Sequence, residues 1–245
     1  MIRSPRLLMA LTLLVSLWRP AHAELPVLRI GYYDFPPSIY TDAAGATHGP
    51  TAEVMRKVAH QAGYEPYFRA LPSARLYAAL RDGSVDVWPG ATGKPELAPH
   101  TLEGRNLLGE VDINLYLRPG SALPHSLDAL PGEGLIVLNG YNYAPQVLER
   151  LRRPGMRLHK ASSHVAALEM LLHGRGDYLL DYGMPASQAR RALGVPELPS
   201  LPVRTLPIRF IASRYAPDAA ALLERLDQAY DALDAAGVDL RVPSR

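Results

Sequence analysis

The sequence predicts an α/β protein of two lobes, each built from β-strands that alternate with α-helices. β-rich runs alternate with helical spacings between residues 27 and 88, and the same alternation begins again at residue 135. Such alternation is typical of βαβ units with a mostly parallel sheet. A chain of 245 residues is long enough for one large core or for two smaller ones.

The first set of predicted elements ends near residue 88. Pro36 and Pro37 end its first strand, since consecutive prolines cannot donate to a ladder. Gly63 and Gly83 follow its two helices, and glycine readily adopts the left-handed conformation of a helix cap. In order, we expect a strand, a helix, a strand, a helix and a strand over residues 27–33, 51–62, 64–69, 72–81 and 85–88.

The second set repeats this order between residues 135 and 180. Ser163 suits the N-cap of its second helix, and Gly174 suits the end of that helix. In both sets an aspartate follows a glycine by three residues, at Asp86 and Asp177, and we interpret both as structural turn residues. The expected elements are a strand, a helix, a strand, a helix and a strand over residues 135–138, 143–152, 157–159, 165–173 and 178–180.

The last part of the sequence predicts a strand over residues 207–212 and an amphipathic helix over residues 218–236. The apolar face of this helix includes Leu222, Leu226 and Leu233. We expect the helix to pack against the lobe that the chain builds first.

The first 23 residues predict a secretory signal peptide. They contain three arginines and no acid, a short apolar run over residues 7–17, and Ala21-His22-Ala23 as a cleavage site. The alternative is an uncleaved anchor helix, although the apolar run is short for a membrane span. Removal of these arginines from 26 basic residues leaves 23 against 24 acidic ones, so the +2 charge becomes −1. Nothing in that charge favours nucleic acid as a partner.

Residue types and motifs that the sequence lacks exclude several classes of function. The chain has no cysteine, which excludes disulfides, thiol catalysis, cysteine metal sites and a lipid on an N-terminal cysteine. Neither a zinc-binding His-Glu-x-x-His nor a phosphate-binding loop occurs, and the dinucleotide pattern that starts at Gly132 lacks its third glycine. We therefore expect no metal and no cofactor.

Several motifs together resemble a known family. They are LRIGYYDFPPSIY at 28–40, LRDGSVDVWPGAT at 80–92, SLDAL at 126–130, Gly140-Tyr141, and ALEML at 167–171 followed by GRGDY at 174–178. Each motif is weak alone, but their order and spacing resemble the periplasmic solute-binding proteins of polar amino-acid ABC transporters, the bacterial extracellular solute-binding proteins of family 3. The resemblance covers nearly the whole chain after residue 23.

The resemblance implies a two-lobed periplasmic-binding-protein fold of type II, with a ligand cleft between the lobes. It implies two crossover strands, near 113–118 and 204–211. Lobe one then comprises residues 24–115 and 207–245, and lobe two comprises residues 116–206. It also implies a periplasmic, non-lipidated monomer that binds a small polar solute, amino-acid-like or amine-containing, and passes it to a membrane permease.

The resemblance also assigns a ligand site. Phe35, Tyr40 and Trp88 are expected to form aromatic walls, with packing in the core as the alternative. Polar contacts are expected from Gly90 and Thr92 of lobe one, from Tyr141 and Asn142 of lobe two, and from Asp181. Asp181 is placed to receive an α-amine, with a turn residue at a strand end as the alternative. The arginine that usually grips the α-carboxylate has no counterpart in residues 93–100, and Lys94 or Arg75 are the candidate replacements.

Two other functions stay open at this point. One is a ligand sensor that signals through a membrane partner. The other is a periplasmic lyase or dehydratase on the same scaffold, since fold does not determine function. Such an enzyme needs a general acid or base, and Glu169, Asp181 and His164 are the candidates. We expect binding without catalysis.

Overall fold

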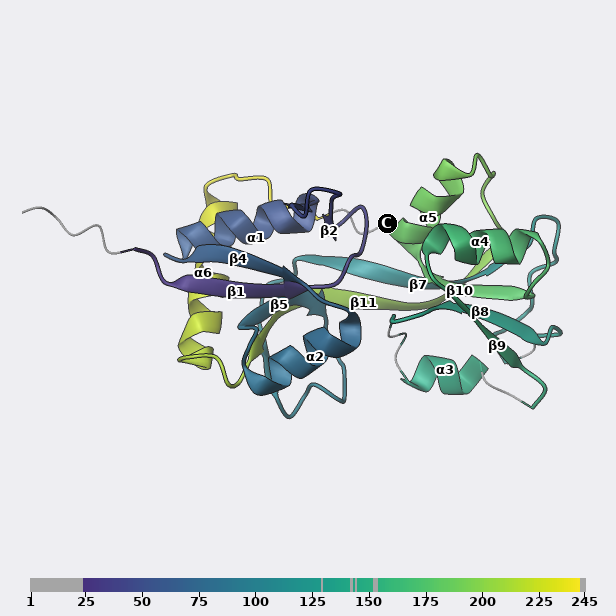
Figure 1. Cartoon of the computed structure of the whole chain (residues 1–245), viewed down its shortest axis with the longest axis horizontal. Helices are drawn as coiled ribbons and strands as arrows, with labels where there is room; N and C mark the ends of the chain where they lie inside the picture. The colour runs from purple at the N-terminus through teal and green to yellow at the C-terminus, as the bar shows by residue number, and fades with distance from the viewer. Residues whose placement is uncertain (1–23, 129, 142, 144, 152–153, 243–245) are drawn as a thin grey trace, which may run out of the picture.

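The structure is a computed structural model that describes residues 24–128, 130–141, 143, 145–151 and 154–242. The molecule is elongated, with a group of helices and strands at each end, and the long strands β7 (Gly109–Leu117) and β11 (Ser200–Ser213) run between the groups (Figure 1). We call the group that contains the first strand lobe one and the other group lobe two. The predicted signal peptide lies outside the described residues.

One continuous sheet runs through both lobes. From one end to the other its main path comprises β4 (Glu65–Ala70), β1 (Val27–Tyr32), β5 (Val87–Ala91), β11 (Ser200–Ser213), β7 (Gly109–Leu117), β10 (Tyr178–Tyr182), β8 (Gly134–Leu138) and β9 (Arg157–Ala161). β6 (Thr101–Glu103) pairs with β11, and β2 (Tyr40–Thr41) pairs with β3 (Thr47–His48) in a separate hairpin. β4, β1 and β5 of lobe one pair in parallel, and so do β10, β8 and β9 of lobe two, as the sequence predicts.

Helices cover both faces of the sheet in both lobes (Figure 1). Lobe one carries α1 (Pro50–Gln61), α2 (Ser73–Asp82) and α6 (Ala219–Ala235), and lobe two carries α3 (Pro145–Leu151), α4 (His164–Leu172) and α5 (Gly183–Ala192). Ser163 caps α4 by accepting a hydrogen bond from the backbone N–H of Ala166, and Gly83 ends α2 in the left-handed conformation. Both caps are as predicted.

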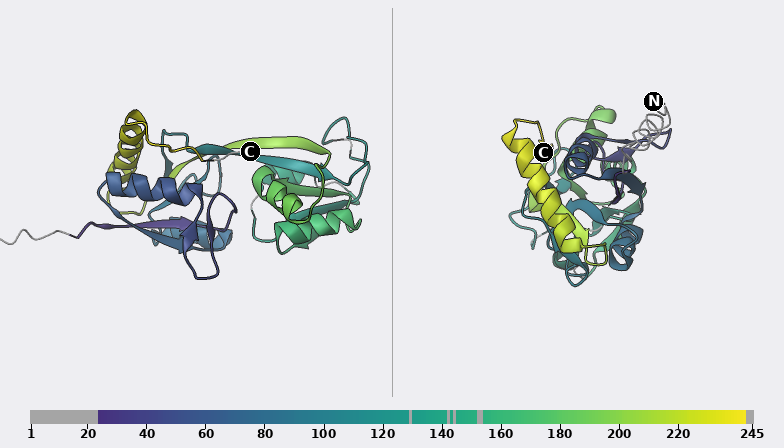
Figure 2. Two further views of the ribbon diagram at one scale, coloured as in Figure 1. Left: turned by 90° about the horizontal axis from the view of Figure 1, so that it is seen from above. Right: turned by 90° about the vertical axis from the view of Figure 1, so that its left-hand side faces the viewer.

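The last helix, α6, returns to lobe one, as the sequence predicts. Its Leu222 and Leu226 pack in the same buried cluster as Val54 and Val58 of α1. Figure 2 shows α6 crossing the outer side of this lobe.

The crossovers β7 and β11 are longer than the predicted segments. They pair antiparallel along most of their length, with an irregularity between Pro202 and Arg204. This ribbon carries the chain in both directions between the lobes. The exact lobe boundaries at residues 115 and 206 stay a prediction.

Helix α5 was not predicted from the sequence. It begins at Gly183, has Pro185 in its first turn and carries adjacent arginines near its end. Glycine and proline lower helix propensity, so the segment lacks a clear helical signal. Its buried face includes Met184, Ala186 and Ala189, and packing in lobe two stabilises it.

The two aspartates interpreted as turn residues have equivalent structural roles. The Asp86 carboxylate, before β5, accepts the backbone N–H of Arg29 in β1 at 2.8 Å and also pairs with the Arg29 guanidinium. The Asp177 carboxylate, before β10, accepts the backbone N–H groups of Glu133 and Gly134 at 2.8 and 3.0 Å. In each lobe a carboxylate therefore joins the beginnings of two strands.

We expect Asp86→Ala to lower the free energy of unfolding by about 2–3 kcal/mol, because it leaves the Arg29 N–H without its acceptor and removes a charged hydrogen bond. Urea unfolding followed by circular dichroism measures this loss. Glu65→Ala, at an exposed position of β4, is the control and should change stability by less than about 0.5 kcal/mol. An equal loss in both variants would contradict the role assigned to Asp86.

Candidate functional site

The carboxyl ends of the strands in both lobes meet at the middle of the molecule. β5 runs antiparallel to β11, β10 runs antiparallel to β7, and β7 and β11 run antiparallel to each other. The strands β5 and β10 therefore point toward one another. Their last residues, Ala91 and Tyr182, pair with Ile208 and Ile113, and Ile113 also pairs with Arg204 of β11. Along the ribbon the two ends are thus about four residues, or roughly 13 Å, apart.

A cleft of about 540 Å³ lies between the loops at these strand ends. Lobe one contributes the loop after β1 and the start of α2, and lobe two contributes the loop after β8 and the start of α4. Its walls are Tyr33, Asp34, Pro36 and residues 70–73, 138–141 and 162–164. Clefts at the carboxyl ends of strands are the usual ligand sites of open α/β sheets.

The polar lining of the cleft is mostly uncharged. Ser73, Ser162 and Ser163 bring hydroxyl groups, and the first turns of α2 and α4 border the cleft. Helix N-termini favour negative ligand groups because their N–H groups carry partial positive charge. Among the described residues, Asp34 is the single acid in the lining, and no lysine or arginine borders the cleft.

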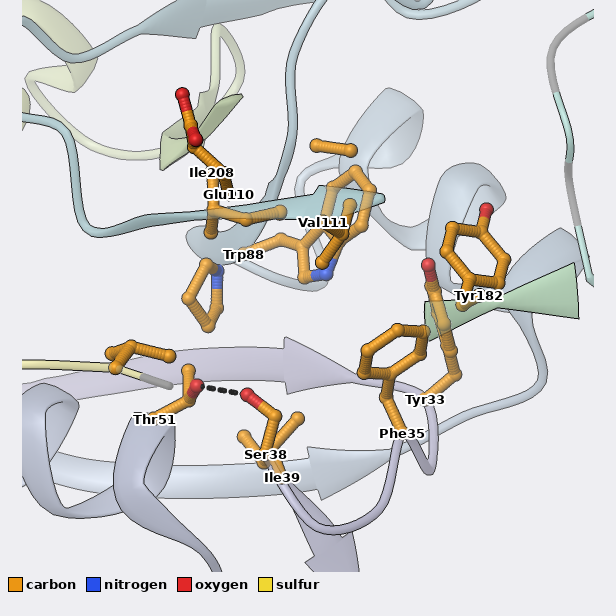
Figure 3. Close-up of a pocket in the computed structure, with 14 residues that line it drawn as sticks. Tyr33, Phe35, Ser38, Ile39, Thr51, Trp88, Glu110, Val111, Tyr182 and Ile208 are labelled. Carbon is orange, nitrogen blue, oxygen red and sulfur yellow. Dashed lines mark hydrogen bonds between the residues drawn. The ribbon is translucent and has the colours of Figure 1, made fainter. Parts of the chain in front are cut away.

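A second, smaller cavity of about 40 Å³ lies beside the ends of β1 and β5 (Figure 3). Phe35, Trp88, Gly90 and Tyr182 are among its walls, and Tyr33 borders both cavities. Its lining is largely apolar apart from Glu110 and the polar pair Ser38–Thr51, which is closed by a hydrogen bond of 2.6 Å. This cavity suits an apolar or aromatic group rather than a charged one.

Aromatic rings separate the two cavities and join the lobes. The Tyr33 ring centroid lies 5.9 Å from that of Trp88 and 5.7 Å from that of Tyr141, and Phe35 lies 5.1 Å from Tyr182. We call Tyr33, Phe35, Trp88, Tyr141 and Tyr182 the aromatic cluster. Tyr33, Phe35 and Trp88 come from lobe one, whereas Tyr141 and Tyr182 come from lobe two. Aromatic faces of this kind cover apolar stems or cations of a ligand.

A chain of polar groups lies behind the cluster. The Asp181 carboxylate, 0% exposed, lies 2.9 and 3.0 Å from Nδ1 of His164. The opposite ring nitrogen, Nε2, lies 2.9 Å from the Tyr141 hydroxyl. That hydroxyl donates to the backbone carbonyl of Asp34 at 2.7 Å, across the cleft. Burial raises the pKa of Asp181, and the hydrogen bond with His164 opposes that rise.

Four of the predicted site residues line the two cavities. They are Phe35, Trp88 and Gly90 in the small cavity and Tyr141 in the larger cleft. Asp181 lies nearby but behind His164, with both oxygens in contact with Nδ1 and one accepting the Tyr182 N–H at 2.7 Å. Asn142 lies outside the described residues.

The other predicted residues lie away from both cavities. Tyr40 packs against the His48 ring in the β2–β3 hairpin, and the Thr92 N–H donates to Pro207. Lys94 is buried beside Tyr77, with Nζ 5.7 Å from the ring centroid, and burial lowers the Lys94 pKa. Arg75 is exposed on α2. Neither replacement considered for the missing arginine therefore borders the cleft.

Sequence reasoning missed Tyr33, Ser73 and the pairing of His164 with Asp181. From sequence, His164 is a candidate only for acid–base catalysis, and the 17 positions that separate it from Asp181 give no sign of contact. A usable signal was its position directly after the helix cap Ser163, since that places its ring at the helix end that faces the strand termini. Glu169, the other catalytic candidate, is exposed.

Comparisons with known proteins place the chain in a family. Residues 28–238 match the model of the bacterial extracellular solute-binding proteins, family 3, so the chain belongs to that family. No curated protein sequence matches it significantly.

Solved structures with the same fold have diverse roles. A histidine kinase sensor domain with similarity to periplasmic binding proteins has a TM-score of 0.72 at 22% identity, over 87% of this chain and 92% of that chain. The ancestral amino acid-binding protein AncCDT-1, a precursor of cyclohexadienyl dehydratase, has a TM-score of 0.68 at 19% identity, over 86% of this chain and 90% of that chain. An ABC uptake transporter substrate-binding protein from Streptococcus pneumoniae with bound histidine has a TM-score of 0.69 at 18% identity, over 86% of this chain and 88% of that chain. At these identities the likeness establishes the periplasmic-binding-protein fold.

The described residues alone also bear on metal binding and membrane insertion. They contain no group of histidine and acidic side chains arranged to hold a metal ion. None of their helices combines the length and the apolar character that a bilayer span requires.

We expect Gly90→Ala to disturb the small cavity, because a Cβ at this position would lie 2.0–2.3 Å from the Trp88 ring. The ring has to move, and overpacking of this kind costs about 1–3 kcal/mol of stability. Near-ultraviolet circular dichroism and urea unfolding measure both effects. Gly183→Ala is the matched control, since its Cβ would meet atoms no closer than 3.5 Å. Unchanged Trp88 signals in Gly90→Ala would contradict the packing described.

Proposed function

We propose that this protein is a periplasmic solute-binding protein that captures a small polar molecule in the cleft between its lobes. The observation that carries the proposal is a cleft whose walls come from both lobes, which are joined through the β7–β11 ribbon. Flexing of such a ribbon changes the width of the cleft, so a ligand that contacts both walls favours closure. Membership of an extracellular solute-binding family supports the same function.

The ligand we propose is amino-acid-like or carries an amine, with an apolar part. Several proteins of the same fold bind amino acids, and one of them has histidine bound. The aromatic cluster offers faces for an apolar stem or a cation. The hydroxyl groups and helix ends of the cleft offer hydrogen bonds to polar groups, including carboxylates. Since no arginine or lysine borders the cleft in the described residues, carboxylate binding there depends on neutral donors.

Export and delivery complete the proposal. The basic, short apolar start of the sequence and its Ala-His-Ala site support removal of residues 1–23 during export to the periplasm. The mature protein is proposed to act as a monomer and to present its ligand to an ABC-type permease. A permease gene and an ATPase gene beside its own would support this partner.

Sensing is the second candidate function. The observation that favours it is the fold match to a histidine kinase sensor domain. A sensor uses the same ligand-driven closure but contacts a signalling protein rather than a permease. A kinase gene beside this gene, and ligand-dependent kinase activity that requires this protein, would favour sensing over transport.

Catalysis is less well supported by the site. A lyase needs an acid or base exposed to its substrate. Here Asp181 is fully buried, and His164 is engaged at both ring nitrogens. We propose binding without turnover, and mass spectrometry of each binding compound after incubation tests it directly, since loss of the compound would indicate an enzyme.

The test of binding is a screen of polar metabolites against the mature protein by calorimetry and by Trp88 fluorescence. Trp88 is the one tryptophan in residues 24–245, and it lies in the aromatic cluster, so closure should change its emission. We expect Tyr33→Ala to weaken binding at least tenfold, about 1.4 kcal/mol, because Tyr33 borders both cavities.

Tyr40→Ala is the matched control for this loss. Tyr40 is also a tyrosine of lobe one, but it lies outside both cavities, so we expect affinity within about twofold of the wild type, below 0.5 kcal/mol. Binding that Tyr33→Ala leaves intact would contradict the proposed site. A screen in which no small polar solute binds would contradict the proposed function.

A further inference from the structure

The Tyr141 hydroxyl can connect the lobes only when it donates its hydrogen to the Asp34 carbonyl. It has one hydrogen, and a backbone carbonyl such as that of Asp34 can only accept. The 2.7 Å contact between them therefore uses the hydrogen of Tyr141. The oxygen of Tyr141 must then accept a hydrogen from Nε2 of His164, 2.9 Å away.

The other side of the His164 ring requires a second hydrogen. Nδ1 lies 2.9 and 3.0 Å from the oxygens of Asp181, and a bare lone pair against a bare carboxylate would repel. One hydrogen lies between them, on Nδ1 or on the carboxyl group. The Asp181–His164 pair thus holds two hydrogens, one more than a carboxylate beside a neutral imidazole.

Loss of that extra proton to solvent reverses the hydrogen bond between His164 and Tyr141. The single remaining hydrogen stays on Nδ1, where it faces the negative carboxylate. Nε2 then carries a lone pair and needs a donor, and the donor within reach is the Tyr141 hydroxyl. When Tyr141 turns its hydrogen to Nε2, the Asp34 carbonyl loses its partner from lobe two.

We propose that His164 is a positioning residue that links closure of the cleft to one proton on the Asp181–His164 pair. With the proton present, His164 donates to Tyr141, and Tyr141 donates to Asp34 across the cleft. Without it, this contact between the lobes is lost and the cleft opens more readily. The inference concerns closure of the ligand-free protein, and it rests on the proposed function only for its effect on ligand affinity.

The other titratable groups around the Asp181–His164 pair do not gain or lose a proton near pH 7. The titratable side chains that face it are Tyr116 of β7, Tyr182 at the end of β10, and Tyr141 and Tyr143 before α3. Burial raises the pKa of all four, so these phenols stay neutral near pH 7.

The carboxylates nearest to these hydrogen bonds are those of Asp34 and Asp181. The Asp34 carboxylate accepts hydrogen bonds from the N–H and hydroxyl of Thr41 at 2.8 and 2.9 Å, and only its backbone carbonyl meets Tyr141. Burial of the Asp181 carboxyl also raises its pKa, which favours retention of the shared proton. Closure is therefore favoured at lower pH and lost as the pH rises.

A second contact across the cleft does not depend on pH. The Ser73 hydroxyl donates to the Gly140 carbonyl, and neither group titrates in this range. The proton therefore changes the closed-to-open ratio without controlling it entirely. One hydrogen bond corresponds to a change of about fivefold to tenfold in this ratio. For a ligand that binds the closed form, Kd would rise by at most about tenfold per pH unit.

Distance measurement by fluorescence transfer tests the proposal without a ligand. The chain has no cysteine, so Ala235→Cys in α6 and Arg175→Cys after α4, both at exposed positions, place one dye on each lobe. We expect the closed-to-open ratio of the wild type to fall about fivefold to tenfold between pH 6 and pH 9, with a single-proton profile.

Two variants that each change one or two atoms should shift closure in opposite directions. Asp181→Asn supplies an N–H to Nδ1 and leaves the His164 hydrogen on Nε2, so the protein should stay closed up to pH 9. Tyr141→Phe removes the donor to Asp34, so the protein should be more open at all pH values. Both should lose the pH dependence, and His173→Gln, at the far end of α4, should retain it.

Other outcomes would overturn the proposal. They are pH-independent closure of the wild type between pH 6 and pH 9, an unchanged pH profile in Tyr141→Phe, or an Asp181→Asn protein that opens like the wild type. Circular dichroism of each variant shows whether it is folded before the distances are compared. A ligand screen that fails while this pH profile holds would contradict the proposed function and not the proton linkage.

Discussion

The antiparallel pairing of β7 with β11 is the interaction on which the rest of the molecule depends. The main path of the sheet passes from one lobe to the other through this pair. Its antiparallel register makes β5 and β10 point toward each other, and the strand ends stop about 13 Å apart along the ribbon. A gap of that size matches a small solute rather than a macromolecule. The position and the scale of the cleft therefore follow from strand direction, before any side chain is considered.

Side chains then decide which solute that gap accepts. Tyr33 and Phe35 meet Tyr141 and Tyr182 across it, and Trp88 packs against Tyr33, so aromatic surface fills much of the middle of the molecule. A buried carboxylate is costly unless it is paired, and Asp181 has its partner in His164 of the same lobe. The charge that a ligand amine could meet is thus largely neutralised within the protein. Under the proposed function, recognition relies on ring faces, hydroxyl groups and helix ends.

The sequence predicted the fold well because its strongest signals are local. Glycine stops, the Ser163 cap and the alternation of runs are read within a few residues, and they placed most elements correctly. The site was harder to predict, since it depends on contacts between distant residues. Asp181 and His164 meet because a strand and a helix pack side by side, and Tyr141 meets Asp34 because the two lobes are in contact. Lys94 and Arg75 looked suitable by charge, yet burial against Tyr77 and exposure on α2 keep them from the cleft.

The order of the chain along the sheet also bears on how the protein folds. Lobe one is discontinuous, because β11 and α6 complete it only after all of lobe two has been made. Leu222 and Leu226 of α6 cover apolar residues of α1 that come more than 150 positions earlier. Lobe two, by contrast, obtains β8, β9 and β10 from one uninterrupted segment. A chain made from its N-terminus can therefore complete the core of lobe two first, while the apolar face of α1 stays uncovered until the last helix forms. In that interval the chain exposes apolar surface that the finished protein buries.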